Sequence, residues 1–310
     1  MHDIIISEFM DQAAVDLLAR DFKTHYDPDL VDKPEELARL AASARALIVR
    51  NRTQVRGALL EGAGSLECVG RLGVGLDNID VDACKARGVA VFPATGANDL
   101  SVAEYVIATA MMLLRRAYLS TDRVIAGEWP RNALIGGELS GRVMGLVGFG
   151  AIAREVARRA GALGMSVIAF DPFLPADHAV WKGVGNRSLD ALLTEADVVS
   201  LHTPLTTETR HMIDGKVLEL MKDSAVLINA ARGGVVDEDA LCAALKAGKL
   251  AGAALDVFEK EPLDAESGRR FAGIGNLVLT PHIAGVTEES NVRVSRVTAE
   301  AVLKHLRGNS

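Results

Sequence analysis

Cysteine is scarce in this 310-residue chain and follows no ligand spacing. Cys68, Cys84 and Cys242 are odd in number and far apart. This pattern disfavours a disulfide framework and a cysteine-based metal site. We therefore expect three small core residues in a reducing compartment, and no bound metal.

Long apolar runs and clusters of positive charge are also missing. No stretch reaches the roughly 18 apolar residues that a membrane-spanning helix needs. The first residues, MHDIIISEFMDQ, carry several acids and only a short apolar run, which is unlike a signal peptide. The net charge is −7 without a polybasic run, which disfavours nucleic acid and anionic membranes as partners. A cytoplasmic location is the expectation.

What the chain does contain is a regular alternation of short apolar runs with helical patterns. Hydrophobic residues make up 49% and charged residues 24%, as in soluble globular proteins, and the length favours two domains. Strands are predicted in two series, at 4–7, 46–49, 67–70 and 89–92, and then at 143–147, 166–169, 198–201, 225–228, 251–255 and 277–279. Alternating strands and helices predict an α/β fold, with parallel sheets covered by helices on both faces.

Two long helices are predicted outside this alternation. One, Leu100–Leu119, lies between the two series of strands, and the other, Glu288–Leu306, follows the last strand. A single helix is too little to form a domain. We therefore expect the last helix to pack back on the first series, which would make the first domain discontinuous.

The strand at 143–147 runs directly into a glycine turn and a helix. The sequence Gly148-Phe149-Gly150-Ala151-Ile152-Ala153 has the form G-x-G-x-x-A of a dinucleotide-binding turn. The next strand ends at Asp171, close to the expected distance of about 20 residues. An acid there accepts hydrogen bonds from both ribose hydroxyls and repels a 2′-phosphate, which favours NAD over NADP.

Three later strands of the second series are followed by an arginine, an acid and a histidine. Arg232 lies in NAARGGVVDE, Glu261 in ALDVFEKEP and His282 in TPHIAG. Taken singly, each has an ordinary explanation as a surface ion pair, a turn or a locally satisfied side chain. Because ligands bind beyond the carboxyl ends of parallel strands, we expect the three to meet near the glycine turn. Arg232 would hold a substrate carboxylate or carbonyl oxygen, and His282, oriented by Glu261, would take a hydroxyl proton.

On these motifs the sequence resembles the D-isomer-specific 2-hydroxyacid dehydrogenases over nearly its whole length. Further motifs that carry the resemblance are GRLGVGLDNID, NDLSVAEY, GLVGFGAIARE and LHTPLT. The family's catalytic residues fall on Arg232, Glu261 and His282. Its cofactor contacts fall on Gly148, Gly150, Ala151, Ile152, Asp171, Thr203, Pro204, Ala230, Asp256, His282 and Gly285.

The resemblance also implies an architecture. Two Rossmann-like domains would flank a cleft, with a substrate domain at 1–97 plus 286–310 and an NAD-binding domain at 98–285. Members are usually dimers, so a homodimer is expected. Because the chain ends just after its last helix, we expect no C-terminal regulatory domain and no serine feedback.

The resemblance implies substrate contacts from three segments: the loop VRNRTQV, the glycine loop at 73–76 and the segment GEWPR. These contacts are Arg50, Arg52, Val74, Gly75, Arg131 and Arg232. The arginines suggest a second anionic group, sulfonate or phosphate, although one or both could instead pair with acids. We rank the sulfolactate/sulfopyruvate pair slightly ahead of 3-phosphoglycerate, partly because Val74 stands where many phosphoglycerate dehydrogenases have threonine. Glyoxylate or hydroxypyruvate reduction, and an NAD(H)-sensing protein without turnover, are the alternatives.

Overall fold

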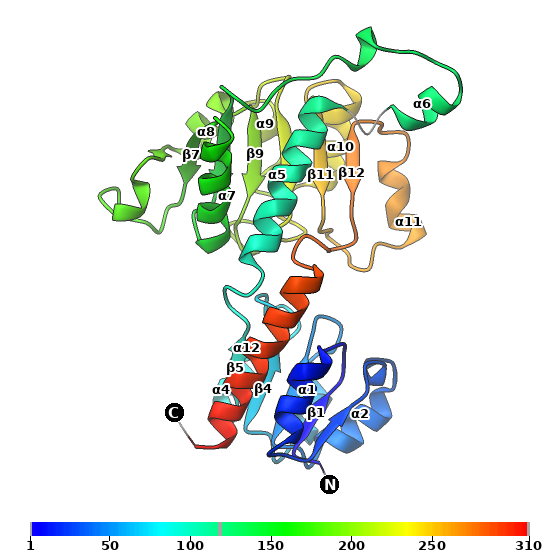
Figure 1. The fold of residues 1–310 in the computed structure, drawn as a ribbon, viewed down its shortest axis with the longest axis vertical. Coiled ribbons are helices and arrows are strands. Elements are labelled where there is room, and N and C mark those ends of the chain that lie inside the picture. The colour runs from blue at the N-terminus through cyan, green and yellow to red at the C-terminus, as the bar shows by residue number, and fades with distance from the viewer. Residues whose placement is uncertain (1, 117–119, 309–310) are drawn as a thin grey trace. The chain divides into compact units, whose positions relative to one another are not determined.

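The computed structural model describes residues 2–116 and 120–308 of the chain. The chain divides into two compact units (Figure 1). Unit 1 is formed by Met1–Asn98 together with Val286–Ser310, and unit 2 by Asp99–Gly285. Each unit contains one parallel sheet with helices on both faces.

The sheet of unit 1 has five parallel strands in the order β2-β1-β3-β4-β5. Their bounds are β1 Ile4–Ile6, β2 Thr24–Tyr26, β3 Ala46–Val49, β4 Cys68–Arg71 and β5 Ala90–Pro93. Apolar residues of α1 (Gln12–Ala19) and α12 (Glu288–Leu306) cover one face. The other face is covered by α2 (Pro34–Ala41), α3 (Gly57–Gly62) and α4 (Val81–Ala86).

The last helix is an integral part of this unit. Val302 and Leu303 of α12 are buried in the same cluster as Ile4 and Ile6 of β1. α12 lies beside α1 although the two helices come from opposite ends of the chain (Figure 1). Its first turn is closed by a reciprocal capping interaction between Thr287 and Ser290.

The sheet of unit 2 has seven parallel strands in the order β12-β11-β10-β9-β6-β7-β8. Their bounds are β6 Val143–Val147, β7 Ser166–Phe170, β8 Gly185–Asn186, β9 Val198–Leu201, β10 Val226–Asn229, β11 Gly252–Leu255 and β12 Leu277–Leu279. The order reverses between β6 and β9, as it does in doubly wound nucleotide-binding folds. The predicted fold class, parallel sheets flanked by helices in two Rossmann-like arrangements, is confirmed.

Two sets of helices cover the faces of this second sheet. One apolar cluster joins the strands to α5 (Asp99–Arg115) and α7 (Ala151–Ala162). The other joins them to α8 (Leu189–Glu195), α9 (Gly215–Leu218) and α10 (Glu238–Lys246). Two short helices, α6 (Thr121–Ile125) and α11 (Ala265–Gly268), lie in the connections.

The structure corrects the sequence-based elements in three places. The edge strands β2 and β8 were not predicted, because β2 is a polar, half-buried Thr-His-Tyr segment and β8 has two residues. The helix predicted at 100–119 ends at Arg115. Arg116 takes a left-handed conformation with φ of 54°, which ends the helix, and residues 117–119 lie outside the described residues.

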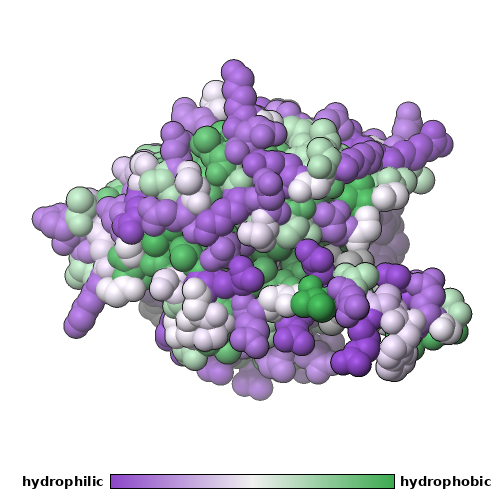
Figure 2. Space-filling model, turned by 90° about the horizontal axis from the view of Figure 1, so that it is seen from above, coloured by the Kyte–Doolittle hydropathy of each residue, from purple (hydrophilic) through white to green (hydrophobic). Residues whose placement is uncertain are grey.

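The three cysteines are free and buried, as predicted. Burial raises the pKa of the Cys68 thiol to about 12, so this thiol stays protonated at neutral pH. Among the described residues, no helix is both long and apolar enough to cross a membrane. The face drawn in Figure 2 shows hydrophilic residues with hydrophobic ones between them.

Candidate active site

The glycine turn joins β6 to α7. Gly148 has φ of 87°, a left-handed conformation that side chains other than glycine rarely adopt. A Cβ at Gly148 would lie 2.7 Å from the carbonyl oxygen of His202, which follows β9. Ala153, one turn into α7, is fully buried against the sheet. Packing alone therefore explains the glycine at the first position of the predicted fingerprint, Gly148, and the small residue at its third, Ala153.

The second glycine of the turn faces open space. A Cβ at Gly150 would meet no atom within 4 Å. The helix that follows begins at Ala151, and no side chain caps its first amide groups. A dinucleotide pyrophosphate needs this combination of close backbone approach and amide donors at a helix N-terminus. The turn therefore fits the cofactor that the sequence predicts.

Asp171 follows β7, the strand next to β6. Its Oδ2 accepts a hydrogen bond from the backbone N–H of Phe149 at 2.9 Å, and its Oδ1 accepts one from Phe173 at 3.0 Å. These bonds fix the carboxylate against the glycine turn. Each carboxylate oxygen keeps a further lone pair for a ribose hydroxyl. A fixed negative charge here is compatible with NAD and unfavourable for a 2′-phosphate.

His282 and Glu261 form a hydrogen-bonded pair. Nδ1 of His282 lies 2.7 Å from Oε2 of Glu261, and Oε1 of Glu261 accepts a hydrogen bond from the backbone N–H of Phe258 at 2.9 Å. Burial opposes the ionisation of Glu261, but the hydrogen bond and charge of His282 outweigh it and lower the pKa of Glu261 below its usual value. Glu261 is therefore ionised at neutral pH and accepts the Nδ1 proton, which leaves Nε2 of His282 for a ligand.

The turn that carries His282 is held by the buried carboxylate of Asp256. This side chain is 1% exposed. Its Oδ1 accepts from the Thr280 hydroxyl at 2.6 Å and from the Ile283 amide at 2.8 Å, and its Oδ2 accepts from the Ala284 amide at 2.8 Å. His282 takes a left-handed conformation with φ of 56° within this turn. A conformation that is rare for histidine is thus fixed by hydrogen bonds to one acid.

Arg232 lies in a second turn, after β10. The buried amide of Asn229 closes this turn: its Nδ2 donates to the Arg232 carbonyl oxygen at 2.9 Å, and its Oδ1 accepts from the Ala231 amide at 3.1 Å. The Arg232 guanidinium donates to the Ala231 carbonyl oxygen at 2.6 Å. Its charge contributes to the lowered pKa of Glu261, so the two side chains lie within electrostatic reach of each other.

The other residues predicted to contact the cofactor lie at the same side of the sheet, where its strands end. They follow the carboxyl ends of β6, β9, β10 and β12 and are Ala151, Ile152, Thr203, Pro204, Ala230 and Gly285. His202, which sequence reasoning left without a role, has Nε2 3.0 Å from the Ser200 hydroxyl. Burial lowers the pKa of His202 to about 4, so its ring is neutral at neutral pH.

Sequence reasoning missed Glu238. This acid is buried at the start of α10, where its Oε1 accepts from the Glu259 amide at 2.7 Å and its Oε2 lies 3.3 Å from Arg270. Glu238 thereby connects the start of α10, which follows the turn of Arg232, to the loop that carries Glu261. Acids in the first turn of a helix are usually exposed, so the sequence held no signal that this one is buried.

Unit 1 holds most of the residues predicted to bind substrate. Arg50 is half-buried and donates to the Asn291 side chain at 2.8 Å, whereas Arg52 is paired with Asp32 on the surface. Val74 is exposed and Gly75 is half-buried in the glycine loop after β4.

The remaining predicted substrate residue belongs to unit 2. Arg131 is exposed at the start of a short helical turn, in the connection between α5 and β6. No ion pair to Arg131 occurs among residues 2–116 and 120–308.

Comparison with known proteins gives the family. Residues 107–284 match the family described as D-isomer specific 2-hydroxyacid dehydrogenase, NAD binding domain. An (S)-sulfolactate dehydrogenase from Chromohalobacter salexigens is 57% identical over 307 residues, which cover 99% of both chains. A D-3-phosphoglycerate dehydrogenase from Archaeoglobus fulgidus is 41% identical over 88% of this chain, but the chain spans only about half of that relative, 52% of its length.

A solved structure gives the same result. A D-lactate dehydrogenase from Aquifex aeolicus, complexed with NAD and lactic acid, has a TM-score of 0.88 at 31% identity, covering 99% of this chain and 96% of that one. The chain therefore belongs to the D-isomer specific 2-hydroxyacid dehydrogenase family. The predictions of this family, of a dehydrogenase and of NAD as its cofactor are confirmed.

Substitution of Gly150 should separate cofactor binding from folding. We expect Gly150→Val to weaken NADH binding by roughly tenfold or more, since its side chain would occupy the space left for the pyrophosphate. The melting temperature should change little, because a Cβ at this position would meet no protein atom within 4 Å beyond its chain neighbours. NADH fluorescence titration and thermal unfolding measure the two effects. Gly161→Ala, in the exposed part of the same helix, is the control, and unchanged NADH affinity in Gly150→Val would contradict this assignment.

Proposed function

We propose that this chain interconverts a D-2-hydroxy acid and its 2-oxo acid, with His282 and Glu261 as the acid/base pair and Arg232 orienting the substrate. The observation that carries the proposal is the 2.7 Å contact between His282 and Glu261, beside the turn that presents Arg232. Bound NAD would supply the hydride acceptor, and NADH the donor.

The roles of the side chains follow from their protonation. With Nδ1–H held by ionised Glu261, Nε2 of His282 can take the proton of the substrate hydroxyl as the alcohol is oxidised. Glu261 then stabilises the imidazolium that forms. In reduction the same imidazolium returns the proton to the carbonyl oxygen. The Arg232 guanidinium can bind the substrate carboxylate through a forked pair of hydrogen bonds.

We further propose that the substrate carries a second anion, as sulfolactate and sulfopyruvate do. Arg50 supports this, because its half-buried guanidinium forms no ion pair with any residue in the described part of the chain. The backbone N–H groups of Val74 and Gly75 can donate hydrogen bonds to the carboxylate, and exposed Arg131 offers another cation. Arg52 is already paired with Asp32, so we assign it a smaller part.

The 57% identity to a protein named (S)-sulfolactate dehydrogenase favours a sulfonate. A phosphate is also a tetrahedral oxyanion, and 3-phosphoglycerate is therefore the second candidate. The relative that acts on it, judged by its name, is less similar, at 41% identity. Hydroxypyruvate and glyoxylate remain further alternatives.

A homodimer and a cytoplasmic location also stay predictions. Exposed Ile125, Trp129 and Ile135 lie close together in sequence, in the segment between α5 and β6. Large exposed apolar side chains are typical of surfaces that associate with a partner, which supports a dimer through this segment. The buried, free cysteines are compatible with a reducing compartment.

Turnover of NADH with sulfopyruvate, 3-phosphohydroxypyruvate, hydroxypyruvate and glyoxylate tests the proposal. We expect the highest kcat/KM with sulfopyruvate. His282→Ala should lower kcat by roughly 10²–10⁴-fold and leave NADH affinity nearly unchanged, because the proton transfer is lost while the other cofactor contacts remain. Absence of turnover with all four acids, together with tight NADH binding, would favour an NAD(H)-sensing protein instead.

The two unpaired arginines should discriminate between substrates. Arg50→Ala and Arg131→Ala are expected to lower kcat/KM for sulfopyruvate on the order of tenfold to a hundredfold, mainly through KM, since a charge-assisted contact is lost. Glyoxylate, which has one anionic group, should be affected about threefold or less. Arg39→Ala, at an exposed position of α2, is the control. Equal losses with both substrates would remove the case for a second anion.

A further inference from the structure

Glu8 is a buried acid that the proposed chemistry does not use. Glu8 follows β1, at the carboxyl ends of the strands in unit 1, and is 4% exposed. No ion pair to Glu8 occurs among residues 2–116 and 120–308. Burial of an unpaired carboxylate is costly unless hydrogen bonds compensate it, so the question is which donors surround this one.

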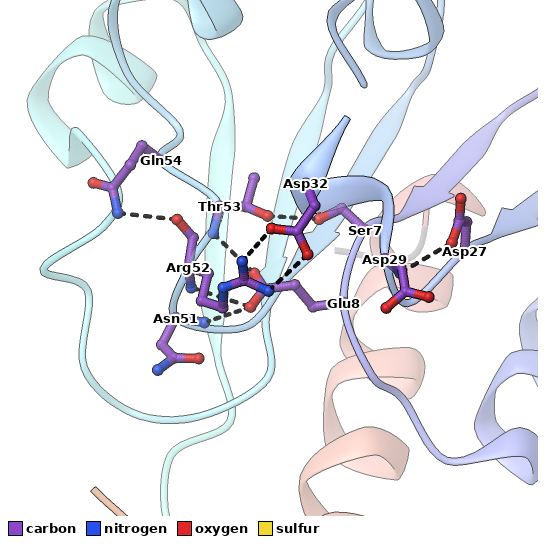
Figure 3. Close-up of polar contacts among 9 residues, drawn as sticks. All are labelled: Ser7, Glu8, Asp27, Asp29, Asp32, Asn51, Arg52, Thr53 and Gln54. Atoms are coloured by element: carbon purple, nitrogen blue, oxygen red, sulfur yellow. Dashed lines mark hydrogen bonds and ion pairs between the residues drawn. The ribbon is translucent and has the colours of Figure 1, made fainter. Parts of the chain in front are cut away.

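The donors are the backbone amides of four consecutive residues after β3, Arg50 to Thr53. Figure 3 draws Glu8 beside Asn51, Arg52 and Thr53. Oε1 of Glu8 accepts from Arg50 at 2.9 Å and from Thr53 at 3.0 Å. Oε2 accepts from Asn51 at 3.3 Å and from Arg52 at 3.1 Å. With two donors at each oxygen, all four lone-pair sites of the carboxylate accept a hydrogen bond.

Two neighbouring side chains hold the same loop. The hydroxyl of Thr53 lies 2.9 Å from that of Ser7, the residue before Glu8 (Figure 3). Nδ2 of Asn78 donates to the Thr53 carbonyl oxygen at 2.7 Å and to the Arg50 carbonyl oxygen at 3.3 Å. The backbone between Arg50 and Thr53 is thus fixed through both its amide and its carbonyl groups.

This loop determines where the Arg50 guanidinium lies. The Arg50 side chain reaches Asn291 of α12, and its guanidinium lies 5.9 Å from the centroid of the Phe9 ring. Both contacts are with neutral groups, which orient the cation and leave its charge for an anion. Burial lowers the pKa of Arg50, and the nearby charge of Glu8 opposes this shift, although the Glu8 oxygens themselves are occupied by amides.

We infer that Glu8 is a positioning residue for recognition of the second anion: by fixing the backbone of Arg50–Thr53 it holds the Arg50 guanidinium in place to receive that group. The inference rests on the proposed role of Arg50. Only a glutamate carboxylate satisfies all four amides. A glutamine would place its NH₂ group against two N–H donors, and an aspartate is one methylene shorter.

A double-mutant cycle with Glu8→Gln and Arg50→Ala tests this inference. We expect Glu8→Gln to lower kcat/KM for sulfopyruvate by roughly tenfold to a hundredfold, mainly through KM, as expected when hydrogen bonds to a charged group are lost. The same change should alter glyoxylate reduction by about threefold or less. In the Arg50→Ala background, Glu8→Gln should add less than about twofold, because residues that act through one contact are not additive.

The matched control is Glu67→Gln, which removes the charge of a partly exposed glutamate of the same unit that pairs with Arg45. It should leave the ratio of the two substrates unchanged. If Glu8→Gln does not fold, Asn78→Ala removes two hydrogen bonds from the same loop and should give the same substrate-selective loss.

The outcomes separate the inference from the function that it rests on. If Arg50→Ala discriminates between the substrates and Glu8→Gln does not, or lowers both equally, the role of Glu8 is wrong and that of Arg50 stands. If Arg50→Ala itself does not discriminate, both are wrong. Additive losses in the double variant would show that Glu8 acts independently of Arg50.

Discussion

The geometry around His282 depends on the buried carboxylate of Asp256. Three donors from the turn after β12 converge on this one side chain, and they fix a left-handed residue whose ring must meet Glu261. The Thr280 hydroxyl that donates to Asp256 lies 2.6 Å from the Tyr105 hydroxyl of α5, so the turn is also joined to the helix that covers the sheet. Without Asp256, the Ile283 and Ala284 amides would lose their acceptor in a buried or partly buried environment, which is costly.

The same physical device recurs at the carboxyl ends of other strands. Asp171 accepts a hydrogen bond from one amide of the glycine turn, Glu238 accepts one from the Glu259 amide, and Glu8 accepts four from the amides after β3. In each case a carboxylate from one strand end or helix start fixes a loop from another. These loops are held by hydrogen bonds to a carboxylate, which are stronger than those between neutral groups. Arg50 and His282, to which we assign roles in binding and chemistry, lie on such loops.

The sequence alone predicted the fold class and the positions of Arg232, Glu261 and His282 relative to the sheet. A glycine turn after a strand and polar residues after parallel strands can both be recognised locally in the sequence. The carboxyl ends of parallel strands lie on the same side of the sheet, so residues that follow them come close together. The roles of Glu8 and Glu238 could not be predicted, because they depend on partners that are distant in the sequence: Glu8 and Arg50, for example, are 42 residues apart. Edge strand β2 was missed for a related reason, since its pairing with β1 rather than its own polar sequence makes it a strand. Arg50 and Arg52 look equivalent in the sequence, and their contacts in the structure distinguish them: Arg50 donates to Asn291, whereas Arg52 pairs with Asp32.

Amide hydrogen exchange of Ile283 and Ala284 in Asp256→Asn tests this account most directly. An asparagine leaves part of the turn without an acceptor, so exchange at these two amides should accelerate by roughly tenfold or more, while the amides of β11 keep their protection. The account predicts that kcat falls in the same variant, since His282 loses its fixed position. A fall in kcat with unchanged exchange at Ile283 and Ala284, or faster exchange with full turnover, would contradict the claim that Asp256 presents His282 for catalysis.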